Sequence, residues 1–531
     1  MAKGKYKEYL KNVIPAIIYS VVCGILTGGV IFSFKFIASK IEGWSRSVYQ
    51  TAQAKPWLIA IIFVVLILFA VLMAFIHKLA PETKGGGIPR SEGVLRGVLS
   101  FRPLRTFLGT FFGSLISFVA GVPVGTEGPS VLLGTSIGGF TGMIDKRQLA
   151  WRRYVMTGGA GAGFAVATGA YVSGILFALE EIHKRFTPML VLTVAISVIS
   201  AGCVNELLCQ LTGVNPSLFS NLIIAKFKLS HVGYLILLGL IVGGTVALFD
   251  FLVKLYSINK VKTKSKYGAF IKLVIIFIAT GVLALTLPDA VYSGHHLIEE
   301  LLFGNKTALL LALILLVRFI LMLTVTDCNV TGGIFIPMLA IGALTGALVS
   351  KLLVILGLPQ EYTQAVILLS TCAFIGGILR APLTATVLFI EITGQFNNLI
   401  FVAIVIFIVT LITEVLNQKA LYDRKLESMQ EEQVAGKSPT ISHFKMTVCA
   451  GAFVVGKSVR DIMWPTSSVV VSVKHLNGNA QDSANDGEKV LFAGDTIIIR
   501  AKYYDKVELT TMLKNLVGKD SIIEEYFPEK Y

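Results

Sequence analysis

The chain has 531 residues, of which 54% are hydrophobic and 15% are charged, and its mean hydropathy is +0.75. Soluble globular proteins carry about 25% charged residues, so this composition excludes an ordinary soluble protein. The formal net charge of +15 at pH 7 invites either nucleic acid or an anionic lipid surface as a partner. We predict a membrane protein that binds lipid and no nucleic acid.

Three apolar stretches approach or reach the roughly 20 residues that a helix needs to cross a bilayer. They are Ile17–Phe34, Trp57–Ile76 and Leu399–Thr413, and none of them contains a charged residue. Shorter apolar pieces at Val131–Ile144 and Gly174–Leu179 cannot span alone. The first stretch lacks a small-residue cleavage site, so we expect a first span rather than a removed signal peptide. The pattern predicts an all-α polytopic membrane protein.

Basic residues are distributed unevenly around the first spans. Four lysines lie before residue 12, whereas the 41–56 loop carries only Arg46 and Lys55. Six Lys or Arg residues follow between positions 78 and 105. The positive-inside rule therefore predicts a cytoplasmic N-terminus.

The six cysteines and seven histidines show no CxxC pair and no spacing typical of metal ligands. We therefore expect free thiols and neither a metal nor a cofactor. The sequence also has no Ser–His, Cys–His or HExxH arrangement, and its glycines at 84–89 lack the strand context of a nucleotide-binding loop. The protein is predicted not to be an enzyme.

The membrane region repeats itself weakly. Pro129 is followed by glycines five and nine residues later, and Pro337 repeats this spacing 208 residues further on. Residues 170–180 (AYVSGILFALE) align with residues 381–391 (APLTATVLFIE) at an offset of 211. Duplicated membrane halves place their site at the midplane, between broken helices. The sequence leaves open whether the halves are inverted or parallel.

After about residue 430 the composition becomes that of a small soluble domain. β-branched runs at 469–473 and 496–500 predict strands, and residues 505–516 have helical spacing with Asp505 as a cap. We expect four parts: a cytoplasmic N-terminus (1–11), a membrane domain (12–430, with halves of about 12–220 and 231–430), a linker (431–440) and a cytoplasmic α+β domain (441–531).

Three segments rich in glycine and proline precede apolar helices: KGGGIP (84–89), GVPVGTEGPS (121–130) and GGIFIP (332–337). The first turn of a helix leaves backbone N–H groups unpaired and carries about half a positive charge. Such ends bind an anion without a fixed cation, which would hold the anion too tightly for transport. Taken singly, each segment is also explained by an ordinary tight turn.

Together, the segments resemble the CLC family of chloride channels and proton/chloride antiporters. The family pattern GSGIP, G(K/R)EGP, GxFxP and a late tyrosine appears here as GGGIP, GTEGP, GIFIP and Tyr422, in the same order. RAPLTATVLFIEIT (380–393) is similar to another stretch of the family. The resemblance covers about residues 10–430. It implies a pseudo-repeated broken-helix architecture and a homodimer with one anion pathway in each subunit.

The resemblance further implies a central chloride held by the backbone amides of Ile334 and Phe335 and by the hydroxyl of Tyr422. The loop that contains Gly86 and Gly87 would face the same ion. The other pore-lining positions within the family motifs are Gly85, Ile88, Pro89, Gly125, Thr126, Gly128, Pro129, Gly333 and Pro337.

Two acids carry the proton chemistry that the resemblance implies. Glu127 corresponds to the gating glutamate, whose ionised carboxylate mimics an anion among helix N-termini and moves away when protonated. Glu181 corresponds to the inner proton acceptor, although a helix-end charge beside basic residues is the alternative. Glu180, which matches Glu391 in the other half, is predicted to be a structural acid. The two proton acids favour an antiporter over a passive voltage- or ligand-gated chloride channel.

The chain departs from the family pattern at three positions, which are Tyr171, where members often carry proline, Gly86 and Thr126. Gly86 replaces the central serine, which removes a hydroxyl ligand and leaves the preferred anion open. Thr126 replaces the Lys or Arg beside the gating glutamate, so weaker attraction of anions to that mouth is expected. A fluoride/proton antiporter is the alternative within the family, but the intact GTEGP and GIFIP segments favour chloride.

The tail pattern GKSVRDIM…VVVSVKHLNGN…LFAGDTIIIRA, across about residues 440–516, resembles the TrkA-C domain of bacterial potassium-uptake regulators. Such domains dimerise, and in some bacterial transporters they bind cyclic dinucleotides. The tail is expected either to sense a messenger such as cyclic di-AMP or to stabilise a dimer without a ligand. A bacterial plasma membrane is the expected location.

Overall fold

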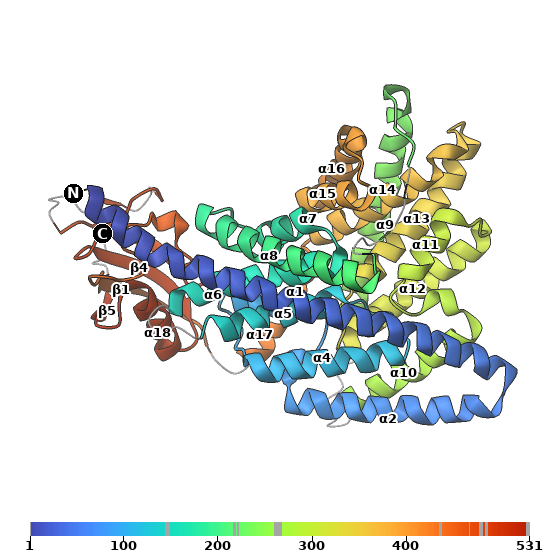
Figure 1. Ribbon diagram of the computed structural model, residues 1–531, viewed down its shortest axis with the longest axis horizontal. Coiled ribbons are helices and arrows are strands. Elements are labelled where there is room, and N and C mark those ends of the chain that lie inside the picture. Colours follow the sequence, from blue (N-terminus) through green and yellow to red (C-terminus); the bar gives the residue numbers. More distant parts are fainter. Residues whose placement is uncertain are drawn as a thin grey trace.

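The computed structural model is mostly helical and ends in a small C-terminal sheet (Figure 1). It describes residues 2–143, 149–215, 219, 222, 224–259, 268–434, 438–466, 468–476, 482–483 and 487–526. Among these residues, nine helices are long and apolar enough to cross a membrane. The chain is therefore a multi-pass membrane protein, as its composition predicts.

The three predicted spans lie in α1 (Ala2–Ala54), α2 (Trp57–Leu79) and α16 (Leu399–Val415). Helices are the expected form because a segment in lipid must bond its own backbone groups. The other helices of the membrane domain are α3 (Ile88–Leu95), α4 (Pro103–Val119), α5 (Glu127–Thr141), α6 (Leu149–Thr168), α7 (Tyr171–Phe177), α8 (Pro188–Thr212), α9 (Val232–Asn259), α10 (Gly268–Thr286), α11 (His295–Phe303), α12 (Ala308–Cys328), α13 (Phe335–Ile355), α14 (Thr363–Leu379), α15 (Pro382–Thr393) and α17 (Leu421–Gln433).

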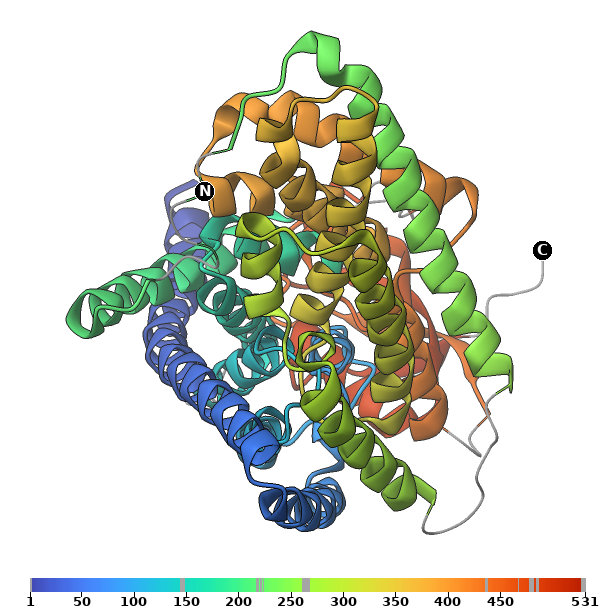
Figure 2. The same ribbon diagram turned by 90° about the vertical axis from the view of Figure 1, so that its right-hand side faces the viewer.

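The two halves of the membrane domain lie side by side. Helices α1 to α8, blue to teal, mainly occupy one side in Figures 1 and 2, and α9 to α16, green to orange, mainly occupy the other. Gly125 and Gly333, which are 208 residues apart, pair with each other in an antiparallel bridge. A residue that pairs with its own counterpart lies on a two-fold axis. The halves are thus related by a pseudo-two-fold rotation at this bridge.

The short helices α7 and α15 exchange N-terminal caps. Glu180 accepts hydrogen bonds from the backbone amides of Leu383 (3.0 Å) and Thr384 (2.7 Å), at the start of α15. Glu391 accepts two equivalent bonds, of 2.7 and 2.8 Å, from the first turn of α7. Each carboxylate satisfies unpaired N–H groups and opposes the positive end of the helix. Glu180 therefore has the structural role that its match to Glu391 predicts.

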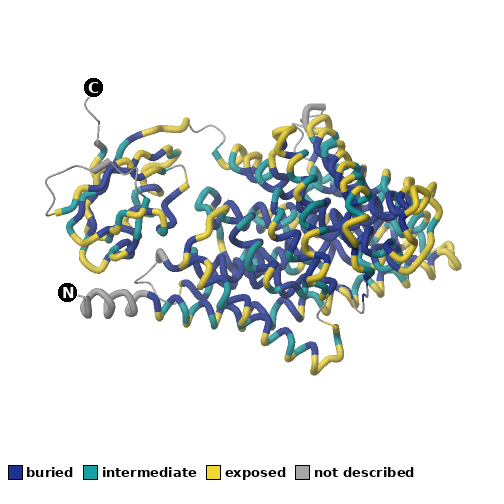
Figure 3. Tube along the Cα trace, turned by 90° about the horizontal axis from the view of Figure 1, so that it is seen from above, coloured by how far each residue is buried: buried dark blue, intermediate teal, exposed yellow. Residues whose placement is uncertain are grey.

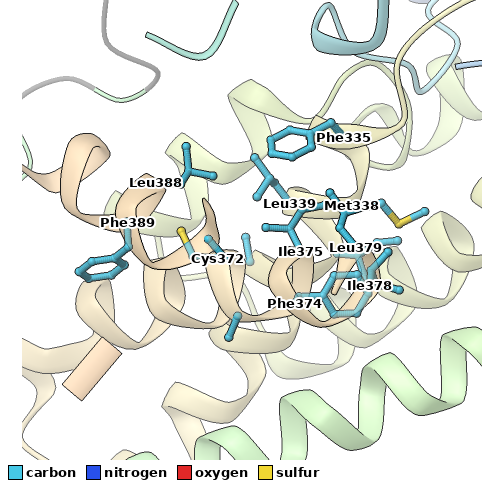
Figure 4. Close-up of a cluster of buried hydrophobic side chains, with 14 of the residues drawn as sticks. Phe335, Met338, Leu339, Cys372, Phe374, Ile375, Ile378, Leu379, Leu388 and Phe389 are labelled. Atoms are coloured by element: carbon cyan, nitrogen blue, oxygen red, sulfur yellow. The ribbon is translucent and has the colours of Figure 1, made fainter. Parts of the chain in front are cut away.

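The core of the membrane domain is made of helices that are apolar on all sides, which is the pattern of a fully buried helix. Every residue of α14 from Ala365 to Leu379 is buried. Figure 3 shows this as continuous dark blue along the inner helices, with exposed residues gathered at the rim. In Figure 4, side chains of α13, α14 and α15 lie together in one cluster, including Phe335, Leu339, Ile375, Leu379 and Leu388. This packing fixes the N-terminus of α13.

The C-terminal domain is a five-stranded antiparallel sheet of order β3-β2-β4-β1-β5 with one helix. The predicted β-branched runs lie in β2 (Ser468–Lys474) and β4 (Thr496–Tyr503). Asp505 accepts bonds from the first amides of α18 (Lys506–Val517), which confirms the predicted cap. The remaining strands are β1 (Thr440–Thr447), β3 (Asp482–Ser483) and β5 (Ile523–Tyr526). In Figure 1 this sheet lies beyond the ends of α6 and α17.

Candidate anion and proton site

Three helices begin close together in the middle of the membrane domain. α3 begins at Ile88, α5 at Glu127 and α13 at Phe335. Each carries a proline within its first three residues, where a missing N–H breaks no helical hydrogen bond. These prolines are Pro89, Pro129 and Pro337. The remaining amides of the first turns have no partner within their own helix, so three positive helix ends converge.

Backbone hydrogen bonds join the loops that precede these helices. The Gly85 amide donates to the Asn329 carbonyl at 3.0 Å. The amides of Gly125 and Gly333 donate to each other's carbonyls at 2.6 and 2.8 Å. The three glycine–proline segments that the sequence singles out therefore form one junction, although they lie up to about 250 residues apart.

Glycine is required where these loops touch. A Cβ atom on Gly128 would lie 1.9 Å from the carbonyl oxygen of Gly86, and one on Gly87 would lie 2.4 Å from that of Gly128. Gly87 also has a φ of +82°, a conformation that other residues rarely adopt. A Cβ atom on Gly86, by contrast, would meet only ordinary contacts at 3.6 Å or more.

A cavity of about 410 Å³ opens onto the junction, and Gly86, Ile334 and Tyr422 help to line it. Tyr422 is buried, and its hydroxyl has no hydrogen-bond partner among the residues that the structure describes. A buried hydroxyl without a partner is costly, and an anion at this place would accept its hydrogen bond. Gly87 and Phe335 directly follow the lining residues Gly86 and Ile334 but do not line the cavity themselves, and the Phe335 ring packs edge-on against another phenylalanine.

Glu127, the first residue of α5, is fully buried. Its Oε1 accepts a hydrogen bond from the Thr126 hydroxyl at 2.9 Å, whereas Oε2 has no partner in the described part of the chain. The carboxylate lies over Gly125, where a Cβ atom would come within 2.6 Å of Oε2. The backbone amides of Glu127 and Ile336 face the carboxylate. It therefore occupies a position between the N-termini of α5 and α13.

Lys35 of α1, which the sequence analysis did not single out, supplies a positive charge near Glu127. Its ammonium group attracts the Glu127 carboxylate electrostatically. Thr126 stands where the family motif has a cation. Lys35 therefore supplies part of the missing positive charge from another helix. The sequence did contain a signal for Lys35, because it directly follows the apolar stretch Ile17–Phe34. Charged residues within membrane helices commonly have a functional role.

Glu181 lies in a π-helical turn, Ala178–His183, that continues α7. Such turns often occur at functional sites. The side chain is buried, and neither carboxylate oxygen has a hydrogen-bond partner among the described residues. Glu92 of α3, missed by the sequence analysis although it follows the GGGIP motif, is also buried and acts on Glu181 as a like charge. Glu127, Glu181 and Glu92 all interact electrostatically with the buried Tyr422.

Basic side chains are in excess at the mouth of the cavity. Lys254, Arg424 and Lys425 line it, against one carboxylate, Asp327. Arg424 and Lys254 also form ion pairs with the buried Asp250. Clefts lined by one sign of charge raise the local concentration of the opposite ion. The mouth is therefore suited to collect anions for the cavity.

We expect Lys254→Gln to raise the chloride concentration for half-maximal flux by about twofold at low ionic strength, because one attracting charge is lost. The difference should disappear at high ionic strength, where surface charges are screened. Flux into liposomes, measured across a chloride series at two ionic strengths, gives both numbers. Lys445→Gln, an exposed charge on β1, is the matched control, and an equal shift in both variants would contradict the role of the mouth.

We expect Gly86→Ser to fold normally, because a Cβ atom at this position meets no atom closer than 3.6 Å. The added hydroxyl gives the cavity one more hydrogen-bond donor and should change the ratio of nitrate to chloride permeability by about threefold or more, the effect of one modest hydrogen bond. Anion flux with the two salts measures the ratio, and the melting temperature tests folding. An unchanged ratio in a stable variant would show that residue 86 does not contact the ion.

The fold and the site define a polytopic membrane protein in which the N-termini of α3, α5 and α13 meet at one junction, next to a cavity and to buried acids. The profile of the family described as "Voltage gated chloride channel" matches residues 68–414. This match covers more than half of the chain, which therefore belongs to the voltage-gated chloride channel (CLC) family, as its motifs predict.

Named relatives match most of the chain. It is 29% identical to an H(+)/Cl(−) exchange transporter ClcA of Cronobacter sakazakii, over 80% of this chain and 92% of the relative. It is 27% identical to the ClcA of Salmonella arizonae, over 81% and 93%. Among solved structures, a slow cyanobacterial Cl−/H+ antiporter matches with a TM-score of 0.73 at 24% identity, over 79% and 99%. A CLC-type fluoride/proton antiporter matches with a TM-score of 0.63 at 21% identity, over 75% and 95%.

Proposed function

We propose that this protein exchanges chloride for protons across a bacterial plasma membrane. The observation that carries the proposal is the pair of buried carboxylates, Glu127 and Glu181, which both interact electrostatically with Tyr422, a residue that lines the cavity. Buried acids in a membrane domain are costly and commonly serve proton transfer. The ClcA relatives are named H(+)/Cl(−) exchange transporters, which is consistent with this chemistry.

The helix ends hold the anion. In this proposal the amides of Ile334 and Phe335, the loop at Gly86 and Gly87, and the Tyr422 hydroxyl bind a central chloride. They supply partial charges and hydrogen bonds rather than a fixed cation, so the ion is attracted without being trapped. The unpartnered Tyr422 hydroxyl supports this assignment.

Glu127 acts as gate and outer proton acceptor. Its ionised carboxylate occupies the anion position between the ends of α5 and α13, and a protonated carboxyl no longer competes for those amides. Chloride binding and proton binding at Glu127 are therefore mutually dependent. Oε2 has no hydrogen-bond partner among the described residues, so the side-chain hydrogen bond from Thr126 holds the carboxylate on one oxygen only.

Glu181 acts as the inner proton acceptor, on the side of the membrane domain that faces the C-terminal sheet. Its oxygens have no hydrogen-bond partner in the described residues, so they do not cap a helix as the Glu180 carboxylate does.

A passive chloride channel is the rival function, because chloride flow alone needs neither acid. A fluoride/proton antiporter is the second rival, and the match to such a structure keeps it open.

Chloride efflux and proton movement from liposomes that contain the purified protein test these functions together. Glu181→Gln should lose proton movement and keep chloride efflux, whereas Glu361→Gln, an exposed acid, should change neither. Chloride efflux without proton movement in the wild type would establish that the protein is a passive channel. Proton movement driven by fluoride but not by chloride would establish the second rival.

The assembly is proposed to be a homodimer with both termini in the cytoplasm, as the family resemblance and the basic N-terminus suggest.

The tail is proposed to be a TrkA-C-type domain that binds cyclic di-AMP. The groove between α17 and the tail is lined by four carboxylates and two lysines, so a dianionic ligand would bind elsewhere on the tail. Calorimetry with the full-length protein and cyclic di-AMP tests binding, and no heat of binding would leave the tail as a structural module.

A further inference from the structure

The end of α3 carries an arginine with four partners at once. Arg96 forms ion pairs with Glu92 at 2.6 Å and with Asp423 of α17 at 3.4 Å. Its guanidinium also donates hydrogen bonds to the backbone carbonyls of Ile182 at 2.9 Å and Glu181 at 3.3 Å. A planar guanidinium with five donors is suited to such a junction, where a lysine ammonium is not equivalent. Arg96 therefore joins α3, α17 and the π-helical turn.

These contacts bear directly on the backbone that carries Glu181. The last carbonyls of a helix have no partner within the helix and carry partial negative charge. Arg96 satisfies two of them in the turn Ala178–His183. The Glu181 carboxylate has no hydrogen bond of its own among the described residues, so its position depends on this backbone.

The C-terminal domain holds the same end of α3 from the other side. The Thr466 hydroxyl donates to the carbonyl of Arg96. Arg153 of α6 donates to the carbonyl of Leu95 through two nitrogens, at 2.9 and 2.6 Å, and to the carbonyl of Met463 at 3.2 Å. The tail thus fixes the carbonyl of Arg96 directly and the carbonyl of Leu95 through Arg153.

We propose that Arg96 is a positioning residue for the inner proton acceptor and that the C-terminal domain acts on proton exchange through it. A displacement of residues 463–466 moves the end of α3, Arg96 moves with it, and the turn that carries Glu181 loses two of its fixed carbonyls. Proton movement then changes more than chloride movement, because the anion-binding helix ends are held by other bonds. This inference rests on the proposed role of Glu181.

The test compares chloride efflux, proton movement and melting temperature in liposome-reconstituted variants of the full chain. Arg96→Gln is expected to lower proton movement at least about tenfold, because small misplacements of a proton-transfer group have effects of this size. Chloride efflux should stay within about twofold. Arg96→Lys, which keeps the charge, should recover part of the proton movement. An equal loss of both fluxes without recovery by lysine would show a merely structural role and overturn the proposal.

The tail is tested separately with a milder change. Thr466→Val removes the hydroxyl that reaches Arg96 and should lower proton movement by about threefold, the effect of one modest hydrogen bond. Thr510→Val in α18 is the matched control, because its hydroxyl bonds only to carbonyls of α18. Equal proton movement in the two variants would overturn the role of the tail. This test does not depend on whether Arg96→Gln folds.

Glu181→Gln, measured in the same series, separates this inference from the proposed function. If Glu181→Gln loses proton movement and Arg96→Gln keeps it, the positioning role is wrong and the proposed function stands. If Glu181→Gln keeps proton movement, the role of Glu181 is wrong and the positioning role falls with it.

Discussion

Replacing Glu127 by alanine is expected to lower chloride-driven proton movement by about a hundredfold, a typical effect of removing a positioned proton-transfer group. Chloride flux should continue, because the carboxylate that lies between the N-termini of α5 and α13 is gone. Proton and chloride fluxes from the same liposomes measure the two effects together.

The pH dependence gives a second signature of the same residue. Wild-type chloride flux should fall as the pH rises, because the ionised Glu127 carboxylate competes with chloride for the helix ends. Glu127→Gln keeps the size of the side chain but cannot ionise, so its chloride flux should not vary with pH. Retained proton movement in either variant, or a retained pH dependence in Glu127→Gln, would contradict the gate.

Gly128→Ala is expected to disrupt the anion site although it adds only a methyl group. That methyl group would lie 1.9 Å from the Gly86 carbonyl oxygen, so two backbone segments must separate. Overpacking of this kind costs about 1–3 kcal/mol. If the cost falls on the site, chloride affinity drops by about fivefold to about 150-fold. Calorimetric titration with chloride measures the affinity.

Gly86→Ala is the matched control for this prediction. It adds the same methyl group on the other side of the same contact, where the closest atom is 3.6 Å away. Its melting temperature should stay close to that of the wild type, whereas that of Gly128→Ala should fall. Equal melting temperatures in the two variants would show that the close approach of the loops does not hold the site together.

The fold was largely predictable from the sequence because its signals are local. Charge-free stretches of about 20 residues such as Trp57–Ile76 indicate spans, and the β-branched runs of the tail indicate strands. The repeat predicted the match between Glu180 and Glu391. Its reciprocal caps, and the bridge between Gly125 and Gly333, required the structure, because the sequence does not say how the halves are oriented.

The candidate site was predictable only where a motif marks it. The three glycine–proline segments and Tyr422 carry a family pattern, and the structure brings them to one junction. Lys35 and Glu92 have no such pattern, and they matter only because packing brings them near the two acids. Arg96 and Glu92 have the local i, i+4 spacing, but the other three partners of Arg96 lie 85 to 327 residues away, so no local signal could have indicated them.

The central claim is that chloride and proton movements are coupled in one protein. The most direct measurement places purified wild-type protein in liposomes with an outward chloride gradient and no initial pH gradient, and follows the external pH. Coupled exchange predicts that chloride efflux drives protons into the liposomes until they move against their own gradient, so the external pH rises. Chloride efflux at a constant external pH, with the membrane potential held at zero, would contradict the account.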